Sequence, residues 1–276
     1  MNHDSITIER DAGVATLWLD RPAKLNALHR ALWASIPAAV EELDADPEVR
    51  VIVLAGRGKA FCAGLDLMDH AAAMAGAGSM SGAGDSPVAR RRALLDDVGR
   101  YQRTASAFAD TRKPVIAAVH GACIGAGIDL ITACDIRFAA ADAVFSVRET
   151  RIAMVADVGT LQRLPRVIGD GPARELIYTG RDIDAGRARA IGLVNDVFPD
   201  ADAVHAHAHA VAREIAANSP LAVQGSKQVL SQAIRRDVQA GLDYVALWNA
   251  AFLHSEDLGE AIAAFAQKRP PAYKGR

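Results

Sequence analysis

The sequence is short of cysteine and of net charge, and each shortage excludes a class of protein. Its cysteines are Cys62, Cys123 and Cys134, an odd and sparse set that argues against a disulfide-built fold and fits a reducing compartment. The 31 basic residues nearly balance the 33 acidic ones, so the formal net charge is −2. Because nucleic-acid binding requires a basic face, we expect no nucleic-acid partner.

Long apolar runs and targeting segments are missing as well. The longest apolar candidate, residues 114–128, contains His120 and is too short to cross a bilayer. The polar N-terminus leads directly into a predicted strand, unlike a signal peptide. Residues 272–276 at the C-terminus are not a peroxisomal address of the Ser-Lys-Leu type. We therefore expect a cytoplasmic protein without a membrane partner.

Strands and helices alternate along most of the chain, and apolar residues make up 51% of it, enough for a sizeable core. Strands are predicted at 6–8, 14–19, 51–56, 113–120, 136–138, 144–147 and 193–198. Helices are predicted at 29–44, 87–110, 160–168 and 173–179, and from 201 onward with breaks near 219 and 257. The pattern indicates an α/β core over residues 1–198 and a helical region over residues 199–276.

Two stretches with unusual composition favour structural roles. Residues 71–87 are rich in Ala, Gly, Ser and Met, which bury little surface, so a mobile loop or weak helix ends are expected there. His205, His207 and His209 alternate, and two of them share a helix face at a spacing that can bind metal. No acidic partner motif accompanies them, so a surface helix is favoured and no metal site is predicted.

Two glycine-containing loops follow buried strands, where α/β sheets bind ligands. They are Phe61-Cys-Ala-Gly-Leu-Asp66 and Gly121-Ala-Cys-Ile-Gly-Ala-Gly127, and the second opens a helix. Glycine allows close approach of the backbone to a ligand, and unpaired N–H groups at a helix start favour negative charge. The loops can supply two N–H donors to one oxyanion, although each alone is equally compatible with an ordinary turn.

Three acids follow the second loop, and each has a structural alternative. Asp129 can complement the helix dipole, and Glu149 can pair on the surface with Arg148 or Arg151. Asp157 can cap the next helix. Its flanking residues are apolar, however, and a carboxyl in such surroundings acquires a raised pKa that suits proton transfer.

In combination these motifs resemble the crotonase, or enoyl-CoA hydratase/isomerase, superfamily. The two loops resemble its oxyanion-hole segments, and Arg21-Pro-Ala-Lys-Leu-Asn-Ala27 resembles its N-terminal signature. The similarity keeps the same motif order from about residue 6 to residue 265. It implies an α/β spiral core of ββα units, and a C-terminal helical region that forms a homotrimer or a dimer of trimers. It also implies an acyl-CoA thioester substrate and no separate cofactor.

Within the superfamily, the stretch Ala156-Asp-Val-Gly-Thr-Leu-Gln-Arg-Leu-Pro165 is similar to the Δ3,5-Δ2,4-dienoyl-CoA isomerases of fatty-acid β-oxidation, as are residues 123–129, 133–137 and 220–226. Hydratases of the superfamily carry a Gly-rich segment where Asp157 stands. The resemblance therefore implies a dienoyl-CoA isomerase. Two alternatives remain. One is another crotonase-type acyl-CoA enzyme, such as a hydratase that uses Asp129 and Glu149. The other is a non-catalytic acyl-CoA-binding or RNA-binding relative, and the near-neutral charge and the full set of acids count against it.

The resemblance also assigns roles to residues. Asp129, Glu149 and Asp157 match the catalytic acids, and the backbone N–H groups of Leu65 and Ala126 match the oxyanion hole. Glu149 is expected to serve C2 and Asp157 to serve C6, with the order open. The substrate-binding positions are Lys24, Ala63, Gly64, Asp66 and Gly125.

The chain departs from the family pattern at two positions. Ala126 stands where the family usually has Gly, which keeps the N–H group but narrows the pocket. Arg151 stands where related isomerases carry an acid, so the charge around Glu149 is expected to differ.

Other residues near the site are expected to play supporting roles. His120 is expected to form a structural hydrogen bond, while Cys62 and Cys123 are expected to pack in the core. The basic residues near the C-terminus that can reach coenzyme A phosphates are Lys268, Arg269 and Lys274.

Overall fold

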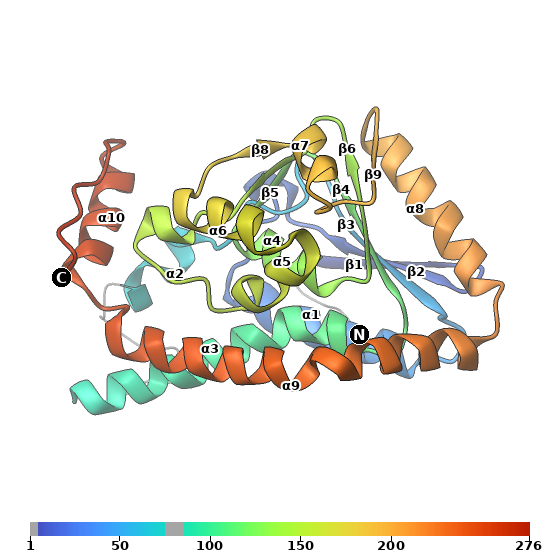
Figure 1. Ribbon diagram of the computed structural model, residues 1–276, viewed down its shortest axis with the longest axis horizontal. Helices are drawn as coiled ribbons and strands as arrows, with labels where there is room; N and C mark the ends of the chain where they lie inside the picture. Colours follow the sequence, from blue (N-terminus) through green and yellow to red (C-terminus); the bar gives the residue numbers. More distant parts are fainter. Residues whose placement is uncertain (1–4, 75–85) are drawn as a thin grey trace.

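A six-stranded sheet with the order β1-β2-β3-β4-β6-β9 runs through the middle of the computed structural model, which describes residues 5–74 and 86–276 (Figure 1). Its strands are β1 (Ile6–Asp11), β2 (Val14–Leu19), β3 (Val51–Gly56), β4 (Val115–Val119), β6 (Ile136–Ala140) and β9 (Asp196–Phe198). The first two form the predicted hairpin, and every later pairing is parallel. Because β3 and β4 are parallel neighbours, the loops after them leave the sheet at the same edge.

A second, three-stranded sheet carries the loop that follows β4. Its strands are β5 (Ala122–Ile124), β7 (Val144–Ser146) and β8 (Ile183–Asp184), in the order β5-β7-β8. Ile124 pairs with Ser146, and the Gly125 N–H donates to the Ser146 carbonyl at 2.8 Å. This pairing brings the start of the second glycine loop to the strand that ends three residues before Glu149.

Helices cover both faces of the large sheet. In chain order the helical segments of the described residues are η1 (Pro22–Lys24), α1 (Arg30–Ala45), α2 (Leu67–Met74), α3 (Pro87–Asp110), α4 (Ala126–Ala133), η2 (Glu149–Ile152), α5 (Thr160–Ile168), α6 (Asp170–Thr179), α7 (Ala185–Ala190), α8 (Ala201–Ala216), α9 (Pro220–Phe252) and α10 (Glu256–Ala266). The predicted α/β core followed by helices is thus confirmed. The short segments that were not predicted are η1, α2, β5, η2, β8 and α7.

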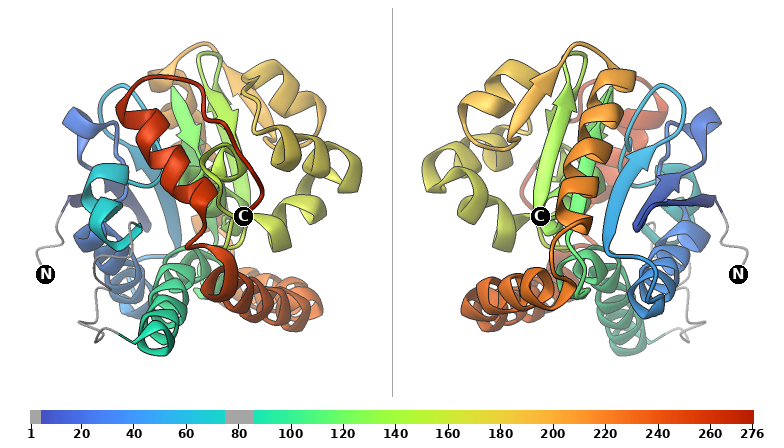
Figure 2. Two further views of the ribbon diagram at one scale, coloured as in Figure 1. Left: turned by 90° about the vertical axis from the view of Figure 1, so that its left-hand side faces the viewer. Right: turned by 90° about the vertical axis from the view of Figure 1, so that its right-hand side faces the viewer.

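The two sheet faces have separate apolar cores. Leu17, Leu54 and Ala117 pack with residues of α1 and α4 on one face. Val53 and Ala118 belong to the other face, which packs against α8 (Figure 2). Strands buried on both faces read as continuous apolar runs, and this explains the sequences of β3 and β4.

The C-terminal helices extend this core. Val204, Ala208 and Ala212 of α8 are buried against the large sheet, while α9 runs beside α3 (Figures 1 and 2). Strand β9 ends at Phe198 and α8 begins at Ala201, so the chain is helical almost directly after residue 198. The division into regions 1–198 and 199–276 remains a prediction.

Within the described ranges, no helix combines the length and the apolar character needed to span a membrane. The predicted loop at 71–87 is only partly described. Residues 71–74 are the last residues of α2, Pro87 begins α3, and residues 75–85 lie outside the described residues.

Candidate active site

The two glycine-containing loops lie against each other at the edge of the sheet. The Cys62 N–H donates to the Ala122 carbonyl and the Ile124 N–H donates to the Cys62 carbonyl, each at 2.9 Å. Gly64 has φ +92°, and a Cβ atom there would lie 2.8 Å from the Ile124 carbonyl oxygen. Only glycine therefore allows this approach of the first loop to the second.

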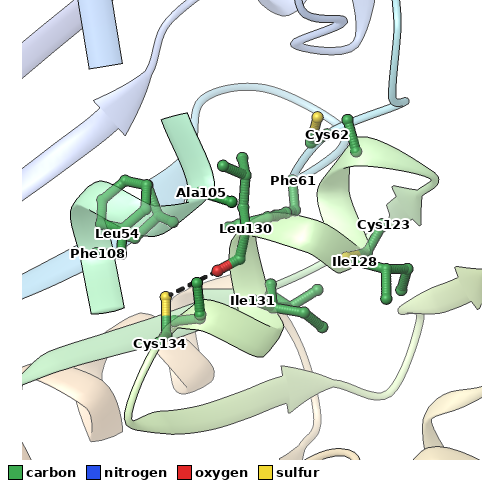
Figure 3. Packing of buried hydrophobic residues seen from close by; sticks show 14 of the residues in the cluster. Leu54, Phe61, Cys62, Ala105, Phe108, Cys123, Ile128, Leu130, Ile131 and Cys134 are labelled. Carbon is green, nitrogen blue, oxygen red and sulfur yellow. Dashed lines mark hydrogen bonds between the residues drawn. The ribbon is translucent and has the colours of Figure 1, made fainter. Parts of the chain in front are cut away.

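Tight apolar packing behind the loops fixes their position. The backbones of Cys62 and Cys123 form an isolated parallel β-bridge between the two loops. Both side chains are buried together with Ile128 of α4 (Figure 3). The Cys134 thiol donates to the Leu130 carbonyl at 3.3 Å. All three cysteines are free and buried, and burial raises the pKa of the Cys62 thiol to about 12. The prediction that Cys62 and Cys123 are packing residues is confirmed.

Residues of the N-terminal signature, 21–27, hold the first loop in place through hydrogen bonds. Asn26 is fully buried, and its Nδ2 donates to the carbonyls of Arg57 and Ala60 at 2.9 and 2.8 Å. The Arg21 guanidinium donates to the Asp66 carboxylate at 2.7 Å. His120 Nε2 lies 3.0 Å from the Gly58 carbonyl, which confirms the predicted structural hydrogen bond.

A cavity of about 580 Å³, a size typical of ligand sites, opens beside the two loops. Every residue that the sequence assigned to the site lines it: Lys24, Ala63, Gly64, Leu65, Asp66, Gly125, Ala126, Asp129, Glu149 and Asp157. Sequence reasoning missed the apolar and aromatic part of the wall: Trp33, His70, Leu94, Val98, Tyr101, Leu253 and Phe265. These residues come from helices far apart in the sequence, and their helical spacing was the only available signal.

The two backbone N–H groups predicted for an oxyanion hole lie on this wall. Ala126 is the first residue of α4, and a Cβ atom at Gly64 would lie 3.7 Å from its nitrogen. Neither the Leu65 N–H nor the Ala126 N–H donates to an acceptor within the described residues. Both donors are therefore available to a ligand in the cavity.

Asp129 is buried, with 2% of its surface exposed, in the first turn of α4. Its Oδ1 accepts hydrogen bonds from the backbone N–H and the hydroxyl of Thr160, at 2.6 and 2.7 Å. Burial raises the pKa of Asp129 to about 7, the Thr160 donors oppose this, and the nearby charge of Asp157 adds to it. A role limited to the helix dipole does not account for these contacts.

Glu149 begins η2 and faces the second loop. A Cβ atom at Gly125 would lie 3.4 Å from Glu149 Oε1, while Oε2 is buried without a hydrogen-bond partner among the described residues. Burial raises the pKa of Glu149 to about 8, and the charge of Asp129 adds to the rise. The surface-pair alternative fails for Arg148, whose guanidinium binds Asp182 at 2.6 Å.

Asp157 is buried in the segment before α5. It does not cap that helix, because the N-cap residue is Gly159. Asn249 of α9 donates from Nδ2 to Asp157 Oδ2 at 2.7 Å. Burial raises the pKa of Asp157 to about 6, and the Asn249 hydrogen bond opposes the rise.

The basic residues considered near the site have partners elsewhere or lie at its rim. Arg151 lines the cavity, and its carbonyl accepts a hydrogen bond from the Tyr273 hydroxyl at 2.6 Å. Arg269 binds Glu260 at 2.5 Å, and the Lys274 ammonium lies 3.8 Å from Glu256. The expected reach of the C-terminal residues toward coenzyme A phosphates remains a prediction.

The sequence favoured a surface helix for the histidine tract of α8, but in the structure its rings pack against other aromatic side chains. His205 packs edge-on against Trp18 and His120, and His207 stacks on Phe198. Burial lowers the pKa of His205 to about 4. Among the described residues, no group of three or more His, Cys, Asp or Glu side chains is arranged to hold a metal ion.

Known proteins are similar in sequence to almost the whole of this chain. The peroxisomal Δ3,5-Δ2,4-dienoyl-CoA isomerase of Arabidopsis thaliana is 44% identical over 263 residues, which cover 95% of this chain and 93% of that protein. The mitochondrial Δ3,5-Δ2,4-dienoyl-CoA isomerase of Rattus norvegicus is 41% identical over 270 residues, covering 97% of this chain and 81% of that protein.

A solved structure extends the similarity to the fold. The enoyl-CoA hydratase/isomerase of Pseudoalteromonas atlantica T6c superposes with a TM-score of 0.84 at 28% identity, covering 98% of this chain and 100% of that one. This match confirms the crotonase-like α/β fold expected from the sequence. The sequence model described as enoyl-CoA hydratase/isomerase matches residues 9–276. The chain therefore belongs to the enoyl-CoA hydratase/isomerase, or crotonase, family.

Proposed function

We propose that this protein isomerises 3,5-dienoyl-CoA to 2,4-dienoyl-CoA in fatty-acid β-oxidation. The observation that carries the proposal is the third buried carboxyl, Asp157, in the same cavity as Asp129 and Glu149. Hydration of an enoyl-CoA needs acids around one water near C2 and C3. A double-bond shift instead requires proton carriers at C2 and at C6, which a third acid provides. The names of the Arabidopsis and rat relatives support this choice.

The proposed oxyanion hole supports Glu149 as the acid that serves C2. The thioester oxygen would accept hydrogen bonds from the Leu65 and Ala126 N–H groups, each contributing about 3–4 kcal/mol to a developing oxyanion. Glu149 Oε1 would lie 3.4 Å from a Cβ atom at Gly125, the residue before Ala126, so its carboxyl lies beside one of the proposed oxyanion donors. Glu149 would therefore take the C2 proton and leave a dienolate.

Asp157 would complete the reaction at the far end of the dienolate. It would protonate C6, and the electron pairs would shift to give the conjugated 2,4-diene. Glu149 then holds a proton and Asp157 is ionised, so a proton must return between them before the next turnover. Asp129 interacts electrostatically with both acids and would mediate this return. Only protons move, so the reaction needs no metal or redox cofactor.

All three carboxyls have raised pKa values, which suits groups that exchange protons near neutral pH. Burial is the largest cause of the rise in pKa at each of them. Because interacting carboxyls titrate as a group, a proton shared through Asp129 can reach Asp157 without leaving the cavity.

An ultraviolet assay with Asp157→Asn tests the proposal. Wild-type protein should convert 3,5-dienoyl-CoA with a gain of absorbance, as the conjugated thioester forms. Asp157→Asn should lower kcat by about 100-fold or more, because the amide cannot donate a proton in the same way. The exposed acid variant Asp202→Asn is the matched control and should keep full activity.

Hydratase activity is the main competing outcome. A 2-enoyl-CoA would lose absorbance on hydration. If the wild-type protein hydrates 2-enoyl-CoA, leaves 3,5-dienoyl-CoA unchanged and tolerates Asp157→Asn, the isomerase proposal is wrong.

We propose further that the chain assembles as a homotrimer, or as a dimer of trimers, through α9. One face of this helix packs inward through Val238, Leu242 and Val245. The other face exposes large apolar residues: Leu221, Val229, Leu230, Tyr244, Leu247, Trp248 and Phe252. An apolar surface of this kind marks a protein interface.

We also propose a cytoplasmic location, which differs from the peroxisomal and mitochondrial locations in the relatives' names.

A further inference from the structure

Asp157 receives its hydrogen bond from a residue that lies 92 positions away in the sequence, on the long helix α9. Asn249 is only 1% exposed, and its Nδ2 donates to Asp157 Oδ2 at 2.7 Å and to the Val155 carbonyl at 2.9 Å. Asn249 is not among the residues that line the cavity. It can therefore affect a ligand only through Asp157 and the adjoining backbone.

The second hydrogen bond fixes the orientation of the Asn249 amide. A backbone carbonyl such as that of Val155 only accepts hydrogen bonds, so the group that faces it must be the NH₂ group. The same NH₂ group faces Asp157 Oδ2, which is thereby held as an acceptor. A proton carried by Asp157 is then directed to its other oxygen, Oδ1.

Other ionisable and polar side chains also surround the Asp157 carboxyl. Asp129 of α4 and Glu149 of η2 face it as acids, and Tyr101 of α3 interacts with its charge. Gln102 of α3 is also close, but its Nε2 donates to the backbone carbonyl of Asp157 at 2.9 Å and not to the carboxyl. Asn249 is thus the side-chain donor that the structure records for the Asp157 carboxyl among the described residues.

We propose that Asn249 is a positioning residue of the active site, which holds Asp157 Oδ2 as an acceptor and leaves Oδ1 to exchange the proton with the substrate. The inference rests on the proposed role of Asp157 in proton transfer. A donor to one oxygen also stabilises the carboxylate that remains after the proton has left, and so favours release of the proton to carbon.

Gln102 provides a matched control. Like Asn249 it is a buried amide in a helix, and it donates two hydrogen bonds, to the carbonyls of Asp157 and Leu242. The two amides differ in the part of Asp157 that they contact. Loss of either removes buried hydrogen bonds and should lower the melting temperature, but only loss of Asn249 should alter the titration of the carboxyl.

The test compares Asn249→Ala, the isosteric Asn249→Asp and Gln102→Ala in the full-length protein. In both Asn249 variants the basic limb of the pH profile of kcat should move upward by about one pH unit, because the ionised form of Asp157 loses its donor. On the plateau of the profile, below the basic limb, kcat should fall about tenfold, because the carboxylate left after proton transfer has lost its donor. KM should stay unchanged, since no residue of the cavity wall is altered. Gln102→Ala should leave both limbs in place. If neither limb moves in the folded Asn249 variants, the inference is wrong.

A direct titration separates this inference from the proposed function. NMR of protein labelled with isotopic aspartate, assigned with Asp157→Asn, measures the pKa of the carboxyl without any substrate. It should rise in both Asn249 variants and not in Gln102→Ala, whatever the protein catalyses; an unchanged pKa would overturn the inference. An upward shift of the acidic limb in place of the basic limb would support the role of Asn249 and contradict Asp157 as the proton donor.

Discussion

At Gly64 the backbone conformation determines which residue can stand at the site. Its φ of +92° and the 2.8 Å separation between a Cβ atom there and the Ile124 carbonyl leave no room for a side chain. The neighbouring Leu65 supplies one of the proposed oxyanion donors. A shift of the first loop would therefore move a donor away from the thioester oxygen, even though Gly64 itself carries no functional group.

Gly64→Ala should lower kcat/KM for 3,5-dienoyl-CoA about 100- to 1000-fold, because one misplaced oxyanion donor costs about 3–4 kcal/mol in the transition state. It should also lower the free energy of unfolding by about 1–3 kcal/mol, through backbone strain. Steady-state kinetics and chemical denaturation measure the two effects. Gly99→Ala is the control: a Cβ atom there meets open space within α3, so stability should rise by up to about 1 kcal/mol with activity unchanged. A fully active Gly64→Ala would contradict the placement of the loop.

At the scale of elements, the sequence predicted those segments whose signal is local. A continuous apolar run predicted the strand Val51–Gly56, and apolar residues at helical spacing predicted the helix Arg30–Ala45. Residues 122–124 read as part of a turn, yet they form β5, because their partner β7 lies 22 residues further along. The helix Leu67–Met74 was not predicted because it is short and its second half falls in the low-complexity stretch that begins at residue 71, where a mobile loop or weak helix ends were expected.

Helix α9 has two proposed functions on different faces, and the proposed assembly function of its exposed face can be tested separately. The double variant Leu247→Glu/Phe252→Glu places charge on exposed apolar positions, where it should not disturb the fold of one chain but should prevent burial between chains. Wild-type protein should sediment as a trimer or hexamer, and the variant as a monomer, in analytical ultracentrifugation. Tyr178→Glu, at an exposed aromatic position on α6, should leave assembly intact. A monomeric wild-type protein would contradict the assembly proposal.

At the scale of the whole molecule, the site depends on contacts that no local pattern contains. Sequence motifs identified the three acids and both oxyanion positions, and the structure places all five beside one cavity. The apolar part of its lining could not be predicted, because Tyr101 and Phe265 reach the cavity only through the way α3 and α10 pack. The same holds for Asn249, which meets Asp157 only because α9 returns along α3.

Isomerisation of 3,5-dienoyl-CoA in heavy water tests the central claim most directly. Two separate acids require the proton at C6 to come from a carboxyl that has equilibrated with solvent, while the proton from C2 goes to a different one. The 2,4-dienoyl-CoA product, isolated after a single turnover and examined by mass spectrometry and NMR, should therefore carry deuterium at C6. A product without deuterium at C6, or no conversion of the dienoyl-CoA at all, would contradict the account.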